Sequence, residues 1–455
     1  MTVEKGEIEQ LFLDVENEIN KFKNEDSILH PYDIAEKLIK LRVINFDKYV
    51  SIIKKIPSTL FADILCEMPD YIQEEISEYV STKKLVNITS NMDSDDAATF
   101  IQNLSDENDE VAQTILENLD DDEKVLIKQL ISYEDNEAGS YMQTELFSAK
   151  INENIGDAIT RLKILKESGQ VNNIWHCHMT DHKGKYRGSI GLEELIIFDH
   201  SLQFHHIPDE KLRTYNVNHK QDIKEAVEMV TNYNLSSLPV TDDLGCLVGR
   251  ITSDDVYDII QENATEQMYH MAGVSEENEQ EESIFQIGKS RAFWLSINLF
   301  TAIVASIVIG FFDATIQSLV ALAVLMPIVA SMGGNAGTQT LTVTVRQMAL
   351  GDIDAEDAKK TIRKEVIISL VNGMLFAIII GFIAFVWFKI PMLGFVIAAS
   401  MIINLLSAGF FGAMIPLLLQ RAGIDPAIGS TVLLTTVTDI VGFFSFLGLA
   451  TLILL

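Results

Sequence analysis

The chain has 455 residues and a net charge of −31 at pH 7, because 65 Asp and Glu outnumber 34 Lys and Arg. Residues 1–285 hold 57 of those acidic residues and 25 of the basic ones, so nearly all the negative charge lies in this part. Such an acidic block repels nucleic acid and anionic lipid headgroups and attracts cations, which excludes nucleic acid as a partner. A merely soluble acidic domain is the plainer alternative.

The acidic part has the features of a cytosolic domain. Its three cysteines, Cys66, Cys177 and Cys246, are odd in number and scattered, which argues against a disulfide framework and for a reducing compartment. The N-terminal residues contain no apolar signal-peptide core. No nucleophile–base pair or catalytic metal motif occurs in the chain, so we do not expect an enzyme.

We predict an all-α N domain over residues 1–135. Within it, residues 30–134 have a helical pattern in which apolar pairs recur roughly every twelve residues, which is typical of an α-solenoid. Asp93, Asp95 and Asp96 crowd one joint between predicted helices. These carboxylates suit either helix capping or metal binding, and the sequence leaves both interpretations open.

Residues 155–268 contain an internal repeat. The segment 180–195 aligns without gaps on 241–256, and each copy reads as helix, apolar strand, turn, strand and helix. Two such units cannot bury their apolar faces alone and should pack together. The pattern resembles a tandem CBS pair, with a first α/β unit over residues 136–200 and a second over 201–262.

The second copy keeps the text G-x-x-T-x-x-D, which forms an adenosine pocket in CBS units, as Gly249, Thr252 and Asp255. The first copy has Gly191 where the hydroxyl is expected. The resemblance therefore implies one nucleotide pocket, for a ligand such as ATP, in the second unit. A purely structural turn is the alternative.

His176, Cys177 and His178 lie on one predicted strand. Strand alternation puts the two histidines on one face and the cysteine on the other. No second cluster has the ligand spacing of a zinc finger, so we do not predict a zinc site here.

The C-terminal third contains five apolar runs that are long enough to cross about 30 Å of hydrocarbon as helices. They lie near residues 293–312, 316–345, 366–388, 394–419 and 429–455. Lys and Arg precede the first run and lie in the connections after the second and the fourth, so they gather on one side. By the positive-inside rule that side is cytosolic, which puts the acidic part inside the cell and the C-terminus outside the cell (inner) membrane.

The second apolar run carries a polar face. Its polar side chains recur at steps of three and four, which places them on one side of a helix: Asn335, Thr338, Gln339, Thr342 and Arg346. Glycines between them allow another helix to approach closely. Packing through small residues explains the glycines, and a polar path through the membrane is the functional interpretation.

The fifth run places Thr431, Thr435 and Asp439 at i, i+4 and i+8. Asp439 lies about ten residues past the cytosolic end of its helix, near the middle of the bilayer, and no basic residue lies at a similar depth. Helix packing explains the threonines, whereas an unpaired carboxylate here favours a cation path. Mg²⁺ keeps several waters and is usually held by one or two carboxylates, so a lone Asp per chain suits a largely hydrated divalent ion.

The text "MPIVASMGGNAGTQTLTVTVRQMALG" and the text "DPAIGSTVLLTTVTDIVGFF" from Asp425 resemble the MgtE family of magnesium channels and transporters. Phrases near residues 29, 138 and 263 match the family as well, so the resemblance covers nearly the whole chain. It implies a homodimer that carries Mg²⁺, with a connecting helix and linker over 263–290 and a five-helix transmembrane pore domain over 291–455.

The resemblance also implies roles for single residues. Asp439 is expected to hold hydrated Mg²⁺ together with Thr431 and Thr435, with Asp425 at the cytosolic mouth and Asn335 and Thr338 beside the pore. Cytosolic Mg²⁺ is expected to bind carboxylates between the N domain, the CBS pair and the connecting helix and so close the pore. These carboxylates are Asp93, Asp95, Asp96, Asp222, Asp255, Asp258 and Glu266.

The chain departs from the pattern of the family at Gln261 and at four positions where carboxylates would be expected to share Mg²⁺: Lys224, Asn234, Asn263 and Gln267. These neutral or basic groups cannot balance a divalent charge. We therefore expect a weakened or reorganised Mg²⁺ sensor and an intact pore. Two functions stay open, a gated Mg²⁺ conduit and a membrane-anchored sensor of divalent cations or nucleotide that does not transport.

Overall fold

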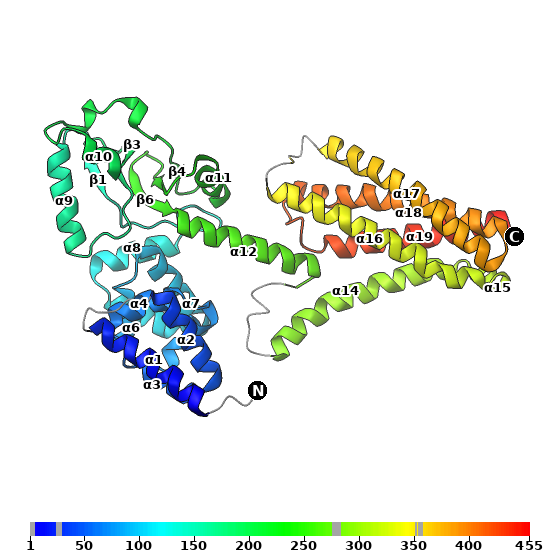
Figure 1. The fold of residues 1–455 in the computed structure, drawn as a ribbon, viewed down its shortest axis with the longest axis horizontal. Helices are drawn as coiled ribbons and strands as arrows, with labels where there is room; N and C mark the ends of the chain where they lie inside the picture. Colours follow the sequence, from blue (N-terminus) through cyan, green and yellow to red (C-terminus); the bar gives the residue numbers. More distant parts are fainter. Residues whose placement is uncertain (1–4, 24–29, 275–283, 351–352, 354–357) are drawn as a thin grey trace. The chain divides into compact units, whose positions relative to one another are not determined.

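The computed structural model describes residues 5–23, 30–274, 284–350, 353 and 358–455. The chain forms two compact units, Met1–Gln261 and Glu262–Leu455, and each is described by itself (Figure 1). The predicted linker residues 275–283 lie outside the described residues.

Short helices build the N domain, which confirms the predicted all-α stack. Proline sets several joints: Pro31 begins α2, and Pro57 and Pro69 precede α4 and α5, where the fixed φ and missing N–H of proline are tolerated. The helices are α1 (Lys5–Lys23), α2 (Pro31–Ile44), α3 (Phe46–Ile53), α4 (Ser58–Cys66), α5 (Asp70–Glu75), η1 (Ile76–Glu78), α6 (Thr82–Thr89), α7 (Ser94–Asn118) and α8 (Asp121–Ile131).

Two three-stranded sheets follow, one in each CBS unit. The first has β1 (Ser148–Lys150), β2 (His176–Thr180) and β3 (Tyr186–Gly191), and the second has β4 (Val217–Asn218), β5 (Ser237–Thr241) and β6 (Leu247–Thr252). Around them lie α9 (Ile155–Glu167), α10 (Leu192–Ile197), η2 (Phe204–His206), η3 (Asp209–Lys211), α11 (Ile223–Tyr233) and α12 (Ser253–Ala272).

The two sheets have the same pairing. In each, the first strand is parallel to the second and the second is antiparallel to the third, with a register irregularity at the same place. The later two strands of each sheet correspond at a shift of 61 residues along the chain. The predicted repeat and the CBS pair are therefore confirmed.

Residues 136–143 pair with the second sheet, although the predicted boundary assigns them to the first CBS unit. Ala138 N donates to Gln221 O at 2.8 Å, and Gln143 and Arg250 exchange two backbone hydrogen bonds of 2.8 Å. One hydrophobic core runs from the N domain into the second CBS unit, whereas the first CBS unit has its own core. The N domain thus packs against the second CBS unit, and the segment that follows it is joined to that unit by backbone hydrogen bonds.

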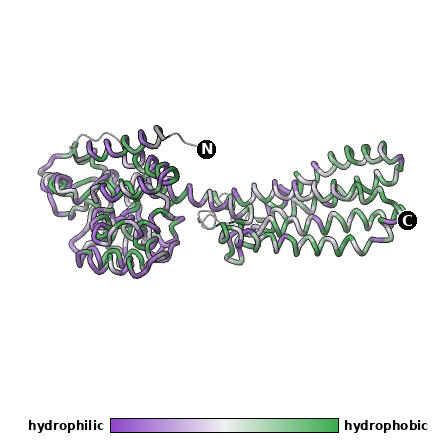
Figure 2. The backbone as a smooth tube through the Cα atoms, turned by 90° about the horizontal axis from the view of Figure 1, so that it is seen from below, coloured by the Kyte–Doolittle hydropathy of each residue, from purple (hydrophilic) through white to green (hydrophobic). Residues whose placement is uncertain are grey.

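The second unit contains the predicted spans. Among the described residues, five helices are long and apolar enough to cross a membrane, which confirms the predicted number. They lie in α14 (Ile284–Gly310), α16 (Ala321–Ala349), α17 (Ala358–Phe388), α18 (Pro391–Arg421) and α19 (Ser430–Leu454), and the short α15 (Asp313–Ser318) precedes α16. Figure 2 shows these helices as mostly hydrophobic over their length, whereas hydrophilic and hydrophobic residues alternate along the chain of the first unit.

Glycines let the membrane helices pack closely. A Cβ atom at Gly412 of α18 would lie 2.9 Å from the carbonyl oxygen of Gly337 on α16, and one at Gly381 of α17 would lie 2.9 Å from that of Gly394 on α18. Any side chain at these positions would push the backbones apart. Small residues therefore hold α16, α17 and α18 together, as is usual for helices in lipid.

Candidate ion path and acidic cluster

Asp439 is a carboxylate of the membrane unit that has no partner among the residues the structure describes. It is the tenth residue of α19, which a rise of 1.5 Å per residue puts about 14 Å into the helix. Its side chain is half-buried and forms no hydrogen bond or ion pair with any residue that the structure describes. A carboxylate at such a depth in hydrocarbon is costly unless water or a cation accompanies it.

Two threonines lie on the same side of α19 as Asp439. Thr435 Oγ1 donates to the Thr431 carbonyl oxygen at 3.0 Å, so its proton is used within the helix while its oxygen can still accept. Thr431 Oγ1 donates to the carbonyl oxygen of Met271, at the end of α12, at 3.0 Å. The predicted face of Thr431, Thr435 and Asp439 is thus built on one helix.

The polar face of α16 points away from the packed interior. Asn335, Gln339 and Thr342 are exposed and Thr338 is half-buried, whereas Gly333 and Gly337 on the other side are buried against neighbouring helices. Asn335 Nδ2 reaches only Ser331 Oγ, at 3.4 Å. Within a single chain, this face would meet lipid.

The end of α12 contacts the mouth of the membrane unit. His270 Nδ1 lies 3.5 Å from Asp425 Oδ2, and His270 Nε2 lies 3.5 Å from Glu266 Oε1. Asp425 also accepts a hydrogen bond from the backbone N–H of Ala427 at 2.7 Å. The sequence did not single out His270, because a lone histidine in a helix carries no pattern of its own.

The three aspartates at the start of α7 do not act as ordinary caps. Asp93 occupies the N-cap position, but its side chain makes no capping hydrogen bond. Glu145 takes that role, because its Oε2 accepts from Ser94 N at 3.2 Å and from Ser94 Oγ at 2.9 Å. Helix capping therefore does not account for the Asp93 carboxylate.

The structure brings Asp93, Asp95, Asp96 and Asp255 into one acidic cluster. Asp95 is only 8% exposed, and its Oδ1 has no hydrogen-bond partner among the described residues. Burial raises the pKa of Asp95 well above its usual value, and the charges of Asp96 and Asp255 raise it further. Asp96 accepts a hydrogen bond from the Cys66 thiol. Its pKa is raised by burial to about 7, although that hydrogen bond lowers it.

Arg250 supplies a positive charge beside this acidic cluster, and sequence analysis missed it. Its side chain is 2% exposed and donates to Asn172 O, Asn173 O and Gln143 Oε1 at 3.0–3.1 Å. Burial lowers the pKa of the guanidinium, whereas nearby Asp93 and Asp255 raise it. The sequence contained one signal for this residue, a charge within an apolar strand. A charged side chain buried in this way needs a partner of opposite charge or hydrogen-bond acceptors.

The other predicted regulatory carboxylates lie elsewhere. Asp222 caps α11 and accepts from Lys224 N at 2.9 Å, Asp258 is exposed on α12, and Glu266 faces His270. In the part of the chain that the structure describes, no group of three or more His, Cys, Asp or Glu side chains is arranged to hold a metal. Any cation here would be held by one or two carboxylates through water, as suits Mg²⁺.

The residues of the predicted nucleotide motif have protein partners. Both the backbone N–H and the hydroxyl of Thr252 donate to Asp255 Oδ2. A Cβ atom at Gly249 would lie 2.8 Å from Gln143 O and from Met142 Sδ, so glycine is needed there for the close approach of residues 142–143. Asp255 therefore belongs both to the nucleotide motif and to the acidic cluster.

His176 and His178 lie on the same face of β2, as strand alternation predicts, with ring centroids 6.4 Å apart. Cys177 points into the core of the first CBS unit. His178 Nδ1 bonds Ser189 Oγ at 2.7 Å, and His176 Nδ1 bonds Ser237 Oγ at 3.3 Å. The two rings are thus hydrogen-bonded to serine hydroxyls, which suits neutral histidines inside a sheet.

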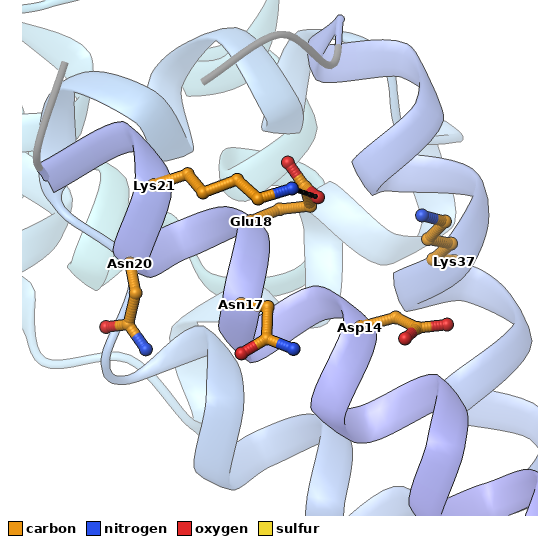
Figure 3. A pocket seen from close by; sticks show the side chains of 6 residues that line it. All are labelled: Asp14, Asn17, Glu18, Asn20, Lys21 and Lys37. Carbon is orange, nitrogen blue, oxygen red and sulfur yellow. Dashed lines mark hydrogen bonds and ion pairs between the residues drawn. The ribbon is translucent and has the colours of Figure 1, made fainter. Parts of the chain in front are cut away.

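A shallow pocket of about 400 Å³ on the N domain does not resemble a cation site. Figure 3 shows its lining of both charge signs, with Lys21 Nζ paired to Glu18 Oε1 at 2.7 Å. The other lining residues are Asp14, Asn17, Asn20 and Lys37. Lysines beside the carboxylates would repel a divalent cation.

Comparison with known proteins identifies the family of the chain. The family model described as a divalent cation transporter, MgtE, matches residues 326–449, the MgtE intracellular N domain matches 29–136, and the CBS domain matches 214–262. The magnesium transporter MgtE of Enterococcus faecalis is 30% identical over 326 residues, 72% of this chain and 71% of that protein. This chain belongs to the MgtE family.

MgtE relatives cover nearly the whole length of the chain. The magnesium transporter MgtE of Thermus thermophilus is 28% identical over 429 residues, 94% of this chain and 93% of that protein. A crystal structure of the cytosolic domain of the Mg²⁺ channel MgtE in complex with ATP is 24% identical, with a TM-score of 0.46, and covers 51% of this chain and 90% of that one. Membership of the MgtE family confirms that the chain is a membrane transporter with cytosolic regulatory domains and not an enzyme.

Proposed function

We propose that this chain conducts Mg²⁺ across the cell (inner) membrane along a path lined by α16 and α19, and that cytosolic Mg²⁺ closes it. The observation that carries the proposal is the Asp439 carboxylate, which lies about 14 Å inside a membrane helix and has no partner in the described part of the chain. A cation passing this point satisfies the carboxylate. Thr431 and Thr435 add oxygens on the same face.

The charge and ligand type suit a largely hydrated ion. One carboxylate per chain, ringed by hydroxyl and amide oxygens, cannot replace a full shell of six oxygens around Mg²⁺, which gives up water reluctantly. Waters of the ion would therefore donate to Asp439 on α19 and to Asn335 and Thr338 on α16. This arrangement binds the ion weakly enough to release it on the other side.

A second copy of the chain completes the path. Asn335, Gln339 and Thr342 are exposed on α16 of a single chain, and polar groups facing lipid are unfavourable. In a homodimer these faces would meet across a two-fold axis, so that two Asp439 side chains face one ion. The positive flanks of the spans support an orientation with the first unit inside the cell and the C-terminus outside.

Closure depends on the acidic cluster and on α12. Mg²⁺ bound through water to Asp95 and Asp255 would relieve the repulsion within the acidic cluster and hold the N domain against the second CBS unit. The chain continues from that unit into α12, whose end contacts the mouth through His270 with Asp425 and through Met271 with Thr431. While the end of α12 lies at the mouth, Asp425 and Thr431 contact protein groups and not an ion.

We infer an adenine nucleotide as a second ligand of the second CBS unit, held by Thr252 and Asp255. Since Asp255 also belongs to the acidic cluster, Thr252→Ala separates the two roles, because it removes the hydroxyl and keeps the carboxylate. Calorimetry should detect weaker ATP binding in Thr252→Ala while Mg²⁺ binding persists. Equal ATP affinity in both proteins would place the nucleotide elsewhere.

The test of the ion path is Asp439→Asn, which keeps the size of the side chain and removes its charge. We expect Mg²⁺ uptake into vesicles to fall by about two orders of magnitude, because the only intramembrane charge on α19 is lost. Asp313→Asn is the matched control, since that carboxylate lies in α15, outside the spans. Uptake near the unmutated level in Asp439→Asn would favour the alternative, a membrane-anchored sensor that does not transport.

A further inference from the structure

Asn404 is a buried amide in the middle of α18. Its side chain is 0% exposed, and its Nδ2 donates to the carbonyl oxygen of Val329 on α16 at 2.8 Å. In a membrane domain, a side-chain amide that crosses from one helix to another acts as a specific link between them. Asn404 is not among the polar groups that line the proposed path.

Glycines on both neighbouring helices make room for this amide. A Cβ atom at Gly333 of α16 would overlap the Asn404 side chain, with 2.7 Å to its Cγ. A Cβ atom at Gly442 of α19 would lie 2.8 Å from Asn404 Nδ2. The amide is therefore wedged between α16 and α19, and any larger residue at either glycine would displace one of the helices.

The other half of the amide is left without a partner. Asn404 Oδ1 is buried and accepts no hydrogen bond among the described residues. An apolar residue of similar volume would fill the same space without burying an unsatisfied acceptor. Asparagine at this position therefore lowers the stability of the fold. In return, its N–H donor selects which carbonyl of α16 faces α18.

We propose that Asn404 is a positioning residue that sets the register of α16 against α19 and thereby the geometry of the ion path. The inference rests on the proposed function, because the two helices that Asn404 touches are those that carry Asn335, Thr338 and Asp439. A slip of one residue along a helix moves a side chain by about 1.5 Å and turns it by about 100°. An ion held through water by groups on two helices is sensitive to such a change.

The test uses a pair of complementary substitutions in the full-length protein. The methyl group of Gly333→Ala would collide with the Asn404 amide. Because contacting residues couple strongly, we expect this variant alone to lower Mg²⁺ uptake by about tenfold. Adding Asn404→Ala removes that amide and should raise uptake again by several fold, but with a changed ratio of Mg²⁺ to Ca²⁺ flux, because the link to Val329 is lost as well. Ser400→Ala is the control, since this equally buried residue of α18 bonds only Ile397 O of its own helix.

Ion selectivity separates positioning from mere folding. Asn404→Leu keeps the branched shape of the side chain and removes the link, so we expect an assembled protein whose ratio of Mg²⁺ to Ca²⁺ flux changes several fold, while Ser400→Ala keeps the original ratio. If Asn404→Leu does not assemble, the comparison of Gly333→Ala with the double variant Gly333→Ala/Asn404→Ala still tests the inference. An unchanged flux ratio in Asn404→Leu, or no restoration in the double variant, overturns the inference while Asp439→Asn still abolishes flux. Normal flux in Asp439→Asn overturns the proposed path and this inference together.

Discussion

His178 illustrates at the residue scale how burial of a side chain makes the stability of the fold depend on pH. Its ring lies inside the first CBS unit and bonds Ser189 Oγ at 2.7 Å. Burial lowers the pKa of His178 from 6.5 to about 3, with smaller contributions from the positive charges of His176 and Arg250. The folded protein therefore keeps this histidine neutral at a pH where the unfolded chain protonates it.

We predict that the cytosolic unit loses stability on acidification because of His178. A depressed pKa in the folded state contributes stability that is complete above pH 6.5 and is lost as the pH falls from 6.5 towards 3. Between pH 8 and pH 5 the loss is about 2 kcal/mol. Urea unfolding, followed by Trp175 fluorescence with Trp294 and Trp387 changed to Phe, measures it.

The matched variants for this prediction are His178→Gln and His182→Gln. Glutamine at 178 does not titrate, so its urea midpoint should depend less on pH by roughly the same 2 kcal/mol. His182 is exposed in the turn after β2, so His182→Gln controls for the loss of a histidine side chain as such. Equal pH dependence in His178→Gln and the unmutated protein would show that another group titrates.

At the scale of elements, the joint between α7, residues 142–145 and β6 combines opposite charges. The buried guanidinium of Arg250 lies near Asp93, Asp95 and Asp255, and its donors are held by Gln143 and by the carbonyls of Asn172 and Asn173. A cation that is part of the protein partly neutralises the cluster when Mg²⁺ is absent. The joint can therefore stay packed at lower Mg²⁺ than its carboxylates alone would allow.

Arg250→Gln should make this joint depend more strongly on Mg²⁺. Loss of the positive charge leaves the carboxylates less compensated, so the Mg²⁺-free joint should open more, while Mg²⁺ should bind at lower concentration. Protease cleavage near residues 133–147 of the full-length protein, measured over a Mg²⁺ series, reports this opening. Arg187→Gln, which removes an exposed guanidinium paired with Asp181, is the control. Identical cleavage curves for Arg250→Gln and the unmutated protein would exclude the counter-charge role.

Sequence patterns predicted the elements much better than their contacts. The apolar runs, the 61-residue repeat and the polar faces of α16 and α19 depend on local periodicity, and the structure has all of them. The wedge of Asn404 and the meeting of Asp95 with Asp255 depend on packing between segments far apart in the chain. No periodicity records such contacts, and Arg250 gave only the weak signal of a charge in an apolar strand.

At the scale of the whole molecule, the net charge of −32 on residues 1–285 opposes packing of the cytosolic domains. The acidic cluster has its carboxylates, whereas four other positions where the family resemblance leads us to expect Asp or Glu do not: Lys224, Asn234, Asn263 and Gln267. One of the four has a structural reason. Asn234 ends α11 with φ 50° and ψ 52°, a left-handed conformation that asparagine tolerates better than most residues.

These four positions lead to a prediction about gating. Amide oxygens offer dipoles and no net charge, so the chain should bind regulatory Mg²⁺ weakly outside the acidic cluster and close only partly at cellular Mg²⁺ levels. We expect shallow inhibition by cytosolic Mg²⁺ in inside-out patch recordings. Restoring Asp or Glu at all four positions should shift closure to lower Mg²⁺ by about tenfold, the effect of roughly 1.4 kcal/mol in binding. Asn234→Asp alone should keep α11 intact, since aspartate also tolerates the left-handed conformation.

The outcome of that Mg²⁺ series also separates the sensor from the pore. Restored carboxylates in the cytosolic domains should leave maximal conductance unchanged, because Asp439 and the polar face of α16 are untouched. Lys224→Gln is a neutral control that tests whether removal of the one positive charge is enough to shift closure. It should produce only part of the shift that the four restorations produce. Steep closure in the unmodified protein, with no shift after four restorations, would mean that the acidic cluster around Asp95 senses Mg²⁺ alone.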